Sequence, residues 1–149
     1  PEYLEWRYQK IPLHRYRIIR VGVNDFMVYR SEPIFNSDAT VIRIVEWSVK
    51  PNNFKTVLAK LIDSAYKERA MLIDFSCTSS EINEQFLKYG GFQYQKEGEM
   101  FKISRWFRPI NSSPPMVIAA KITDISSNTV IKFSSMYLTT GNGDADRMK

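Results

Sequence analysis

The stretch 40–92 constrains the fold most, because its apolar residues follow a strand pattern, then a helix pattern, and then both again. Thr40–Val49 is rich in β-branched and apolar residues, as expected of a strand covered on both faces. The run 51–53 ends this strand and offers side-chain oxygens to cap a helix. The apolar residues that follow recur with the period of a helix that buries one face: Phe54, Val57, Leu58, Leu61, Ile62 and Ala65.

A second strand and a second helix come next. Met71–Phe75 is short and apolar, which predicts another buried strand, and Glu81–Tyr89 predicts a helix that ends at Gly90 and Gly91. Two strands joined through a helix predict a parallel pair. Ligands in such folds bind where a strand's carboxyl end meets the next helix, whose first amides favour anions. We therefore expect any small-molecule site within Trp47–Thr56.

The N-terminal part predicts a helix and a hairpin. Glu2–Tyr8 has the pattern of the end of a helix. Tyr16–Gly22 and Phe26–Arg30 predict two antiparallel strands joined by a turn at Asn24-Asp25. Ser31–Asp38 is mainly polar and predicts a loop.

A second hairpin is expected after the second helix, from Phe92–Gln95 and Met100–Phe107. These elements predict a single domain over residues 1–149 of mixed α+β and α/β class. Its centre is expected to be a mostly antiparallel twisted sheet with one parallel pair and flanking helices.

Composition limits the chemistry. Cys77 is the only cysteine and His14 the only histidine, so an internal disulfide is excluded and a zinc site or a Cys–His nucleophilic pair is disfavoured. The acidic end 141–146 lacks the spacing and the closing glutamate of a calcium loop, so we predict no metal site. A single cysteine fits a reducing compartment, and we expect a cytoplasmic protein.

Charge and hydropathy bear on the partners. The net charge of +5 favours anionic partners in general, but the densest basic and aromatic run, 6–17, also suits a helix followed by a half-exposed strand. Nucleic-acid binding is therefore disfavoured. No apolar run is long enough to cross a bilayer. The chain begins at Pro1 without a methionine, so we expect a fragment of a longer chain with a partner domain upstream.

Three segments carry a resemblance to a known family: Tyr3–Tyr8 followed by Pro12, Phe86–Phe92 with its Gly-Gly-Phe end, and Tyr137–Arg147. With the order of elements over Glu2–Phe107, the chain resembles the GNAT superfamily of N-acetyltransferases. It is similar in particular to acetyltransferase-like proteins associated with bacterial surface-polysaccharide genes. The resemblance implies the acyl-CoA N-acyltransferase fold.

The resemblance also implies an acetyl-CoA site between the central strand and its parallel neighbour, with the diphosphate on the amides that open the following helix. Lys55 and Val57 stand where the family has glycine, and a branched side chain at Val57 would obstruct a phosphate in a loop of the family's shape. Lys50 and Lys55 are expected either to supply charge or to be solvated surface residues. The candidate cofactor-binding residues are Val49, Asn52, Asn53, Phe54, Lys55 and Thr56.

Two residues are catalytic candidates by the same resemblance. Glu46, the only acid in the predicted central strand, would be the general base, and an ion pair or an exposed charge is its alternative role. Arg43 could pair with Glu46 only across a bulge, because residues three apart face opposite sides of a regular strand. The family's acid tyrosine falls at Leu87, so Tyr89, two positions away, is the candidate acid unless it only packs at the helix end.

Two hypotheses follow. The first is an acetyltransferase-like domain that transfers an acetyl group from acetyl-CoA to an amine on a small-molecule acceptor, such as an amino sugar. The second is a non-catalytic half of a larger protein, or a homodimerisation or interaction module, that keeps the architecture and has lost the cofactor loop. Nucleic-acid binding is a distant third.

Overall fold

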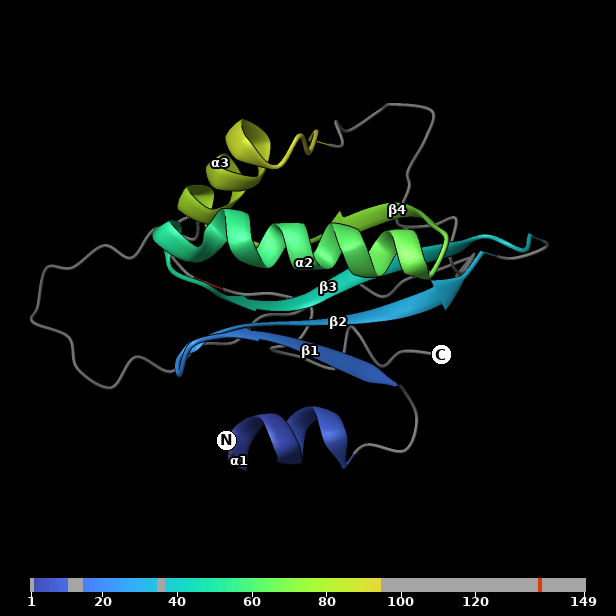
Figure 1. The fold of residues 1–149 in the computed structure, drawn as a ribbon. Helices are drawn as coiled ribbons and strands as arrows, with labels where there is room; N and C mark the ends of the chain where they lie inside the picture. Colours follow the sequence, from blue (N-terminus) through green and yellow to red (C-terminus); the bar gives the residue numbers. More distant parts are fainter. Residues whose placement is uncertain (1, 11–14, 35–36, 95–136, 138–149) are drawn as a thin grey trace, which may run out of the picture.

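The computed structural model describes residues 2–10, 15–34, 37–94 and 137, and this part of the chain has an α+β fold. Figure 1 shows a four-stranded mixed sheet with α2 and α3 on one face and the N-terminal helical segment on the other. In chain order the elements are α1 (Glu2–Leu4), the π-helix η1 (Glu5–Gln9), β1 (Tyr16–Val21), β2 (Asp25–Pro33), β3 (Thr40–Ser48), the 3-10 helix η2 (Pro51–Asn53), α2 (Phe54–Lys67), β4 (Ala70–Phe75) and α3 (Ser80–Tyr89).

The strands lie in the order β1-β2-β3-β4. β1 and β2 form an antiparallel hairpin whose turn contains Gly22 at a φ of +72°, a conformation that glycine adopts without strain. β2 and β3 are also antiparallel, whereas β3 and β4, which are joined through α2, are parallel. The predicted mostly antiparallel sheet with one parallel pair and flanking helices is therefore confirmed.

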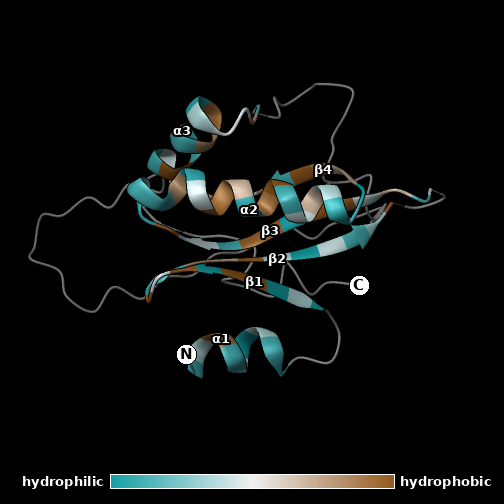
Figure 2. Ribbon diagram, in the orientation of Figure 1, coloured by the Kyte–Doolittle hydropathy of each residue, from teal (hydrophilic) through white to brown (hydrophobic). Residues whose placement is uncertain are grey.

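The main core lies between the sheet and the layer formed by α2 and α3. Figure 2 shows hydrophobic residues along β3 and β4, and hydrophobic and hydrophilic residues in alternation along α2. A smaller cluster on the opposite face joins Leu4 and Tyr8 to Val28 and Val45 of the sheet. The buried residues of the main core are Met27, Tyr29, Ile42, Ile44, Trp47, Phe54, Val57, Leu58, Leu61, Ala65 and Phe86.

A β-bulge in β3 changes which way its last residues face. Val28 pairs with Glu46 and Tyr29 pairs with Ile44, so Val45 is the extra residue. Ile44 faces the α2 layer, and regular alternation would turn Glu46 to the same side. The bulge instead places Glu46 on the face covered by the N-terminal helical segment, where it contacts Tyr8.

The carboxyl end of α2 is fixed to the sheet by Glu68. Its carboxylate accepts hydrogen bonds from Arg17 Nη1 at 2.5 Å, from the Tyr29 hydroxyl at 3.2 Å and from the Ser31 hydroxyl. Its backbone carbonyl accepts one from the Thr40 hydroxyl at 3.1 Å. One residue thereby ties α2 to β1, β2 and β3 and sets how the helix lies across them.

Several expectations about boundaries and burial were wrong. β2 continues through Pro33, which pairs with Thr40, so the predicted loop begins later; proline is tolerated there because it is the last residue of the strand. Ile62 is 52% exposed, because it lies at the edge of the buried face of α2. Phe92–Tyr94 is not a strand. The rest of the predicted second hairpin and the acidic end 141–146 lie outside the described residues.

Leu61 and Ile62 are neighbours in α2 that test the orientation of this helix. Leu61 is fully buried, so Leu61→Ala is expected to lower the free energy of unfolding by about 2–5 kcal/mol through lost burial and a residual cavity. Ile62→Ala, with the side chain half exposed, should cost less than about 1.5 kcal/mol. Urea denaturation measures both, and equal losses would contradict the assignment of the buried face.

Candidate functional site

The corner between β3 and α2, where the sequence predicts an anion site, is closed by contacts within the chain. The carboxylate of Asp25 accepts the backbone N–H of Lys50 at 2.8 Å and the side-chain amide of Asn53 at 2.5 Å. The backbone N–H of Asn53 donates to the Lys50 carbonyl at 2.9 Å, and that of Phe54 donates to the Pro51 carbonyl. Three of the amides expected to receive a phosphate therefore already have acceptors.

The side chains at this corner point in different directions. Phe54 and Val57 are buried in the main core, and the Phe54 ring lies 5.3 Å from that of Trp47 and 5.1 Å from that of Phe86. Of the other predicted cofactor-binding residues, Val49 packs against the core, Asn53 is half-buried, and Asn52, Lys55 and Thr56 are exposed. Asn53 makes no side-chain capping hydrogen bond to α2, because its amide is directed to Asp25.

Asp25 adds negative charge where an anion was expected. The hydrogen bonds from the Lys50 backbone and the Asn53 side chain lower the pKa of the Asp25 carboxyl, so it is ionised at neutral pH. An ionised carboxylate beside the first turn of α2 satisfies that end of the helix and repels a diphosphate.

Glu46, the buried one of the two predicted catalytic residues, lies in a cluster of polar side chains. Its side chain is buried on the face covered by α1 and η1. Its Oε2 accepts hydrogen bonds from the hydroxyl groups of Tyr8, at an oxygen–oxygen distance of 2.5 Å, and Tyr3, at 3.2 Å. Within the described part of the chain no hydrogen bond reaches the other oxygen, Oε1. Among the described residues the carboxylate is thus held through one of its two oxygens.

Both tyrosines remain hydrogen-bond donors at physiological pH. Burial, followed by the hydrogen bond to Glu46 and its charge, raises the pKa of Tyr8 far above that of an ordinary tyrosine. Burial and the charge of Glu46 also raise the pKa of Tyr3. Neither phenol ionises in the working range, so the orientation of the Glu46 carboxylate does not change with pH through loss of these donors.

Arg43 is paired elsewhere. The bulge puts Arg43 and Glu46 on the same face of β3, which the sequence suggests only as an exception. The Arg43 guanidinium nevertheless binds Asp74 of β4, with Nη2 2.9 Å and Nε 3.1 Å from its carboxylate oxygens. Glu46 is therefore neither an exposed charge nor, among the described residues, a member of an ion pair.

Tyr89 and Glu46, the two predicted catalytic residues, are not brought together. Tyr89 is more than half exposed at the end of α3, on the opposite face of the sheet from Glu46 (Figure 1). Its ring lies 6.4 Å from that of Phe54, and the ammonium groups of Lys55 and Lys88 lie 5.8 Å and 5.4 Å from its centroid. Tyr89 thus contacts the closed corner and not the carboxylate.

β3 extends past its parallel neighbour. The last pair between β3 and β4 joins Ile44 to Phe75, whereas β3 continues to Ser48. In this extension the backbone N–H of Trp47, the residue after Glu46, donates to the hydroxyl of Tyr137 at 2.6 Å. The Tyr137 hydroxyl, from a distant part of the chain, therefore accepts the hydrogen bond of the β3 amide next to Glu46.

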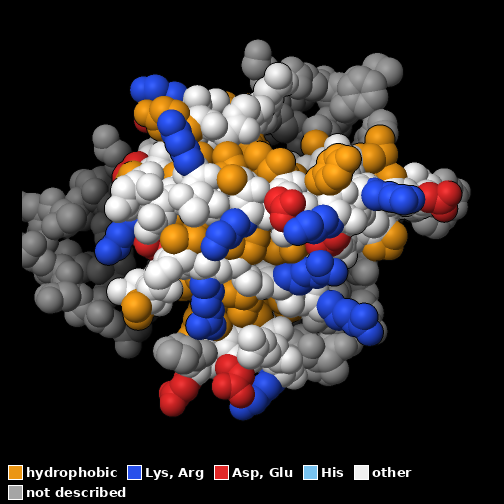
Figure 3. Space-filling view, viewed as in Figure 1, with side chains coloured by type: hydrophobic (Ala, Val, Ile, Leu, Met, Phe, Trp, Pro, Cys, Tyr) orange, Lys and Arg blue, Asp and Glu red, His pale blue; other side chains and the backbone are white. Residues whose placement is uncertain are grey.

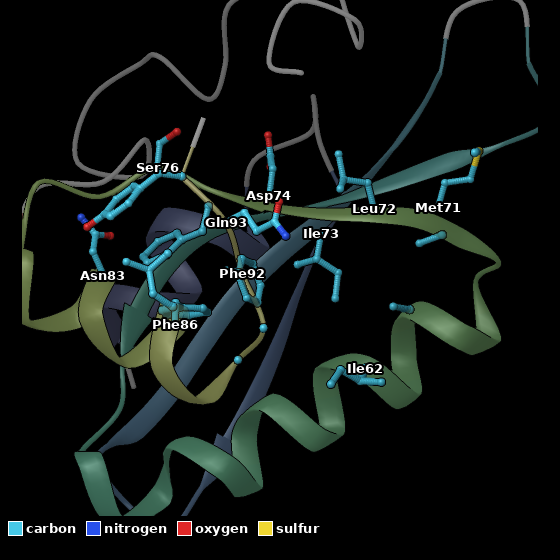
Figure 4. Close-up of a pocket in the computed structure, with 17 residues that line it drawn as sticks. Ile62, Met71, Leu72, Ile73, Asp74, Ser76, Asn83, Phe86, Phe92 and Gln93 are labelled. Carbon is cyan, nitrogen blue, oxygen red and sulfur yellow. The ribbon is translucent and has the colours of Figure 1, made fainter. Parts of the chain in front are cut away.

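A groove of about 590 Å³ lies along β4, and none of the predicted site residues lines it, although Leu87 and Gly90 on either side of Tyr89 do. It is bounded by the carboxyl half of α2, by β4, by α3 and by residues 90–94 (Figure 4). Figure 4 shows Ile73 directed toward α2, whereas Asp74 is directed to the other side of β4. Its apolar lining includes Ile62, Ile73, Phe86, Leu87 and Phe92.

Basic side chains are spread over the face that carries α2 and β1 and do not form a dense patch (Figure 3). Arg17 is paired with Glu68 and Lys67 with Asp63. Among the described residues no group of acidic, histidine and cysteine side chains could hold a metal ion, and no helix is long and apolar enough to cross a membrane.

Comparisons with protein families, curated proteins and solved structures found no match to this chain. The residues that complete the two sites were missed by sequence reasoning: Asp25 at the corner, and Tyr3, Tyr8 and Tyr137 around β3. Tyr3 lies in α1 and Tyr8 in the π-helix η1, whose wider turn departs from the α-helical spacing that sequence patterns assume. Nothing local in the sequence signals that conformation.

Asp25 predicts a dependence of stability on pH. Its pKa is lower in the folded chain than in the unfolded one, so its contribution is present above the unfolded pKa of about 3.9 and disappears as pH falls through the folded pKa. Asp25→Asn should therefore destabilise the chain at pH 7 and matter progressively less in acid. Urea titrations of both proteins across this range measure the difference between their free energies of unfolding. A difference that does not become smaller below about pH 4 would contradict the lowered pKa of Asp25.

Proposed function

We propose that this chain transfers an acyl group from a thioester, such as acetyl-CoA, to an amine, with Glu46 as the general base. The observation that carries the proposal is the carboxylate of Glu46: buried, turned by a bulge, held through Oε2 by two phenols, and without a hydrogen bond to Oε1 from the described residues. Because the carboxylate is already held in one orientation, little free energy is needed to orient it when it accepts a proton. The resemblance to the GNAT superfamily and the parallel pair next to Glu46 support the same reaction.

In the proposed step the amine nitrogen attacks the thioester carbonyl carbon while its proton passes to Oε1 of Glu46. The tetrahedral intermediate then collapses, the carbon–sulfur bond breaks, and the thiolate leaves and takes up a proton from water, while Glu46 returns its proton to solvent. The N–H of Trp47 lies one residue from the base and is suited to donate a hydrogen bond to the carbonyl oxygen once the Tyr137 hydroxyl moves away. Tyr89 takes no part, because it lies on the other face.

The closed corner between β3 and α2 limits the binding free energy that the nucleotide part of acetyl-CoA can contribute. With Lys50, Asn53 and Phe54 amides occupied and Asp25 ionised, the diphosphate of acetyl-CoA finds little to bind at α2. Acyl transfer should then depend mainly on the acyl and pantetheine part of the donor.

The same corner favours a second candidate. If the ionised Asp25 and the buried Phe54 and Val57 exclude the donor altogether, the chain is a non-catalytic acetyltransferase-like half or interaction module. The two candidates differ in whether any acyl thioester binds, and the following experiment separates them.

Thiol release is measured with acetyl-CoA and with acetyl-pantetheine as donors and a panel of primary amines, including glucosamine, as acceptors. We expect kcat/KM for the two donors to agree within about tenfold. A factor of this size corresponds to the loss of one charged hydrogen bond. A preference for acetyl-CoA by several orders of magnitude would contradict the closed corner. No turnover, with no heat on titrating either donor, would support the second candidate.

Glu46→Gln tests the base in the same assay. It keeps the size of the side chain and removes its proton affinity, so kcat/KM should fall by about a hundredfold or more. Tyr89→Phe is the matched control on the opposite face and should retain full turnover. Equal losses in both variants would remove Glu46 from the role of base.

A further inference from the structure

Two exposed aromatic rings belong to the helical segment that covers Glu46, and the proposed reaction uses only the hydroxyl of one of them, Tyr3. Tyr3 is 44% exposed and Trp6 64% exposed, although both belong to the helical segment that covers this face of the sheet. Their ring centroids are 6.4 Å apart and their planes are inclined at 47°. Large rings left in solvent at an angle to one another form two walls that a ligand can contact.

Tyr3 joins this exposed pair to the buried carboxylate. Its hydroxyl donates to Oε2 of Glu46 at 3.2 Å, while its ring stands perpendicular to that of Tyr8 at 6.3 Å. Tyr8 in turn packs edge-on against Tyr16 at 5.0 Å. The carboxylate therefore lies among aromatic rings, one of which reaches solvent.

The charge of Glu46 is only partly compensated in this setting. The residue is 8% exposed, its two hydrogen bonds come from neutral phenols, and both fall on Oε2. Arg7 of the same segment is hydrogen-bonded to Tyr8, with its guanidinium 6.0 Å from the centroid of the Tyr8 ring, and Lys10 is paired with Glu5 at 3.2 Å. A buried carboxylate whose second oxygen has no hydrogen bond from the described residues attracts a cation, and electron-rich ring faces favour a cation that carries alkyl groups.

We propose that Glu46, Tyr3 and Trp6 form a binding site for an organic ammonium ion, with the charge toward Oε1 and the alkyl groups against the two rings. The site takes its ligand without an acyl donor. Only the further statement that this ammonium is the acceptor amine before it loses its proton rests on the proposed function. The site also assigns Tyr3 and Trp6 a role in recognition and none in proton transfer.

Tetramethylammonium chloride is the probe, because it carries the charge and the alkyl groups but has no proton to lose and cannot be acylated. tert-Butanol, neutral and of similar size, is the matched control ligand. Binding is followed by the shift of the Trp6 indole N–H signal in NMR spectra, with the buried Trp47 indole as the internal reference. We expect tetramethylammonium to bind at least about tenfold more tightly than tert-butanol.

Three variants locate the site. Trp6→Ala, read from shifts of the Tyr3 amide, and Glu46→Gln should each weaken tetramethylammonium binding by about three- to tenfold. Tyr66→Ala removes an exposed ring of α2 that lies on the other face of the sheet, and should leave the affinity unchanged. Trp6 is exposed, so its variant should fold, and thermal unfolding verifies this for Glu46→Gln.

Equal affinity for the charged and the neutral probe, or an affinity unaffected by Glu46→Gln, would overturn the site. Its failure and that of the proposed function are distinguishable. Tetramethylammonium binding without acyl transfer would sustain the site and reject the reaction. Acyl transfer that saturating tetramethylammonium does not inhibit would sustain the reaction and reject the statement that the bound ammonium is the acceptor amine.

Discussion

The hydrogen bond between Tyr8 and Glu46 connects the helical segment at the N-terminus to the centre of the sheet, and it exists because β3 contains one extra residue. Without Val45 as a bulge, Glu46 would face α2 and meet the apolar core, where an unpaired carboxylate is costly. With the bulge, the carboxylate faces the N-terminal segment, and a neutral phenol, whose pKa burial raises, serves as its permanent donor. Leu4 and Tyr8 pack on Val28 and Val45 around the same point, so apolar and polar contacts support one another there.

The two faces of the sheet consequently differ in chemistry. The face toward α2 and α3 is apolar. Its polar contacts lie at the two ends of α2, where Asp25 binds one end and Glu68 the other. These contacts complete the packing and use the amides that an anion would need. The opposite face has the buried carboxylate, the phenols and the exposed rings of Tyr3 and Trp6. Our proposals accordingly concern the face of the N-terminal segment, whereas the polar contacts at the ends of α2 serve the packing of the fold.

The order of elements from Thr40 to Tyr89 could be predicted because it depends on apolar periodicity, and the buried positions Phe54, Val57, Leu58, Leu61 and Ala65 follow that period directly. What the sequence could not supply depends on contacts between distant segments. The bulge at Val45 is set by pairing with β2, Asp25 meets Asn53 across 28 positions, and Tyr8 meets Glu46 across 38. Glu46 was identified as a candidate through the resemblance, as the only acid in the predicted central strand. Its partners could not be identified, since no local pattern distinguishes a π-helix from an α-helix over five residues.

The most direct test of this account is a double-mutant cycle between Tyr8 and Glu46, measured by urea unfolding of the wild type, Tyr8→Phe, Glu46→Met and the double variant. Methionine keeps the length of the side chain and accepts only weak hydrogen bonds, and phenylalanine keeps the ring. The account predicts a coupling free energy of about 1–3 kcal/mol, as for a buried hydrogen bond to a charged group. A coupling within about 0.3 kcal/mol of zero would mean that the two residues do not interact, and would contradict the placement of Glu46 on this face.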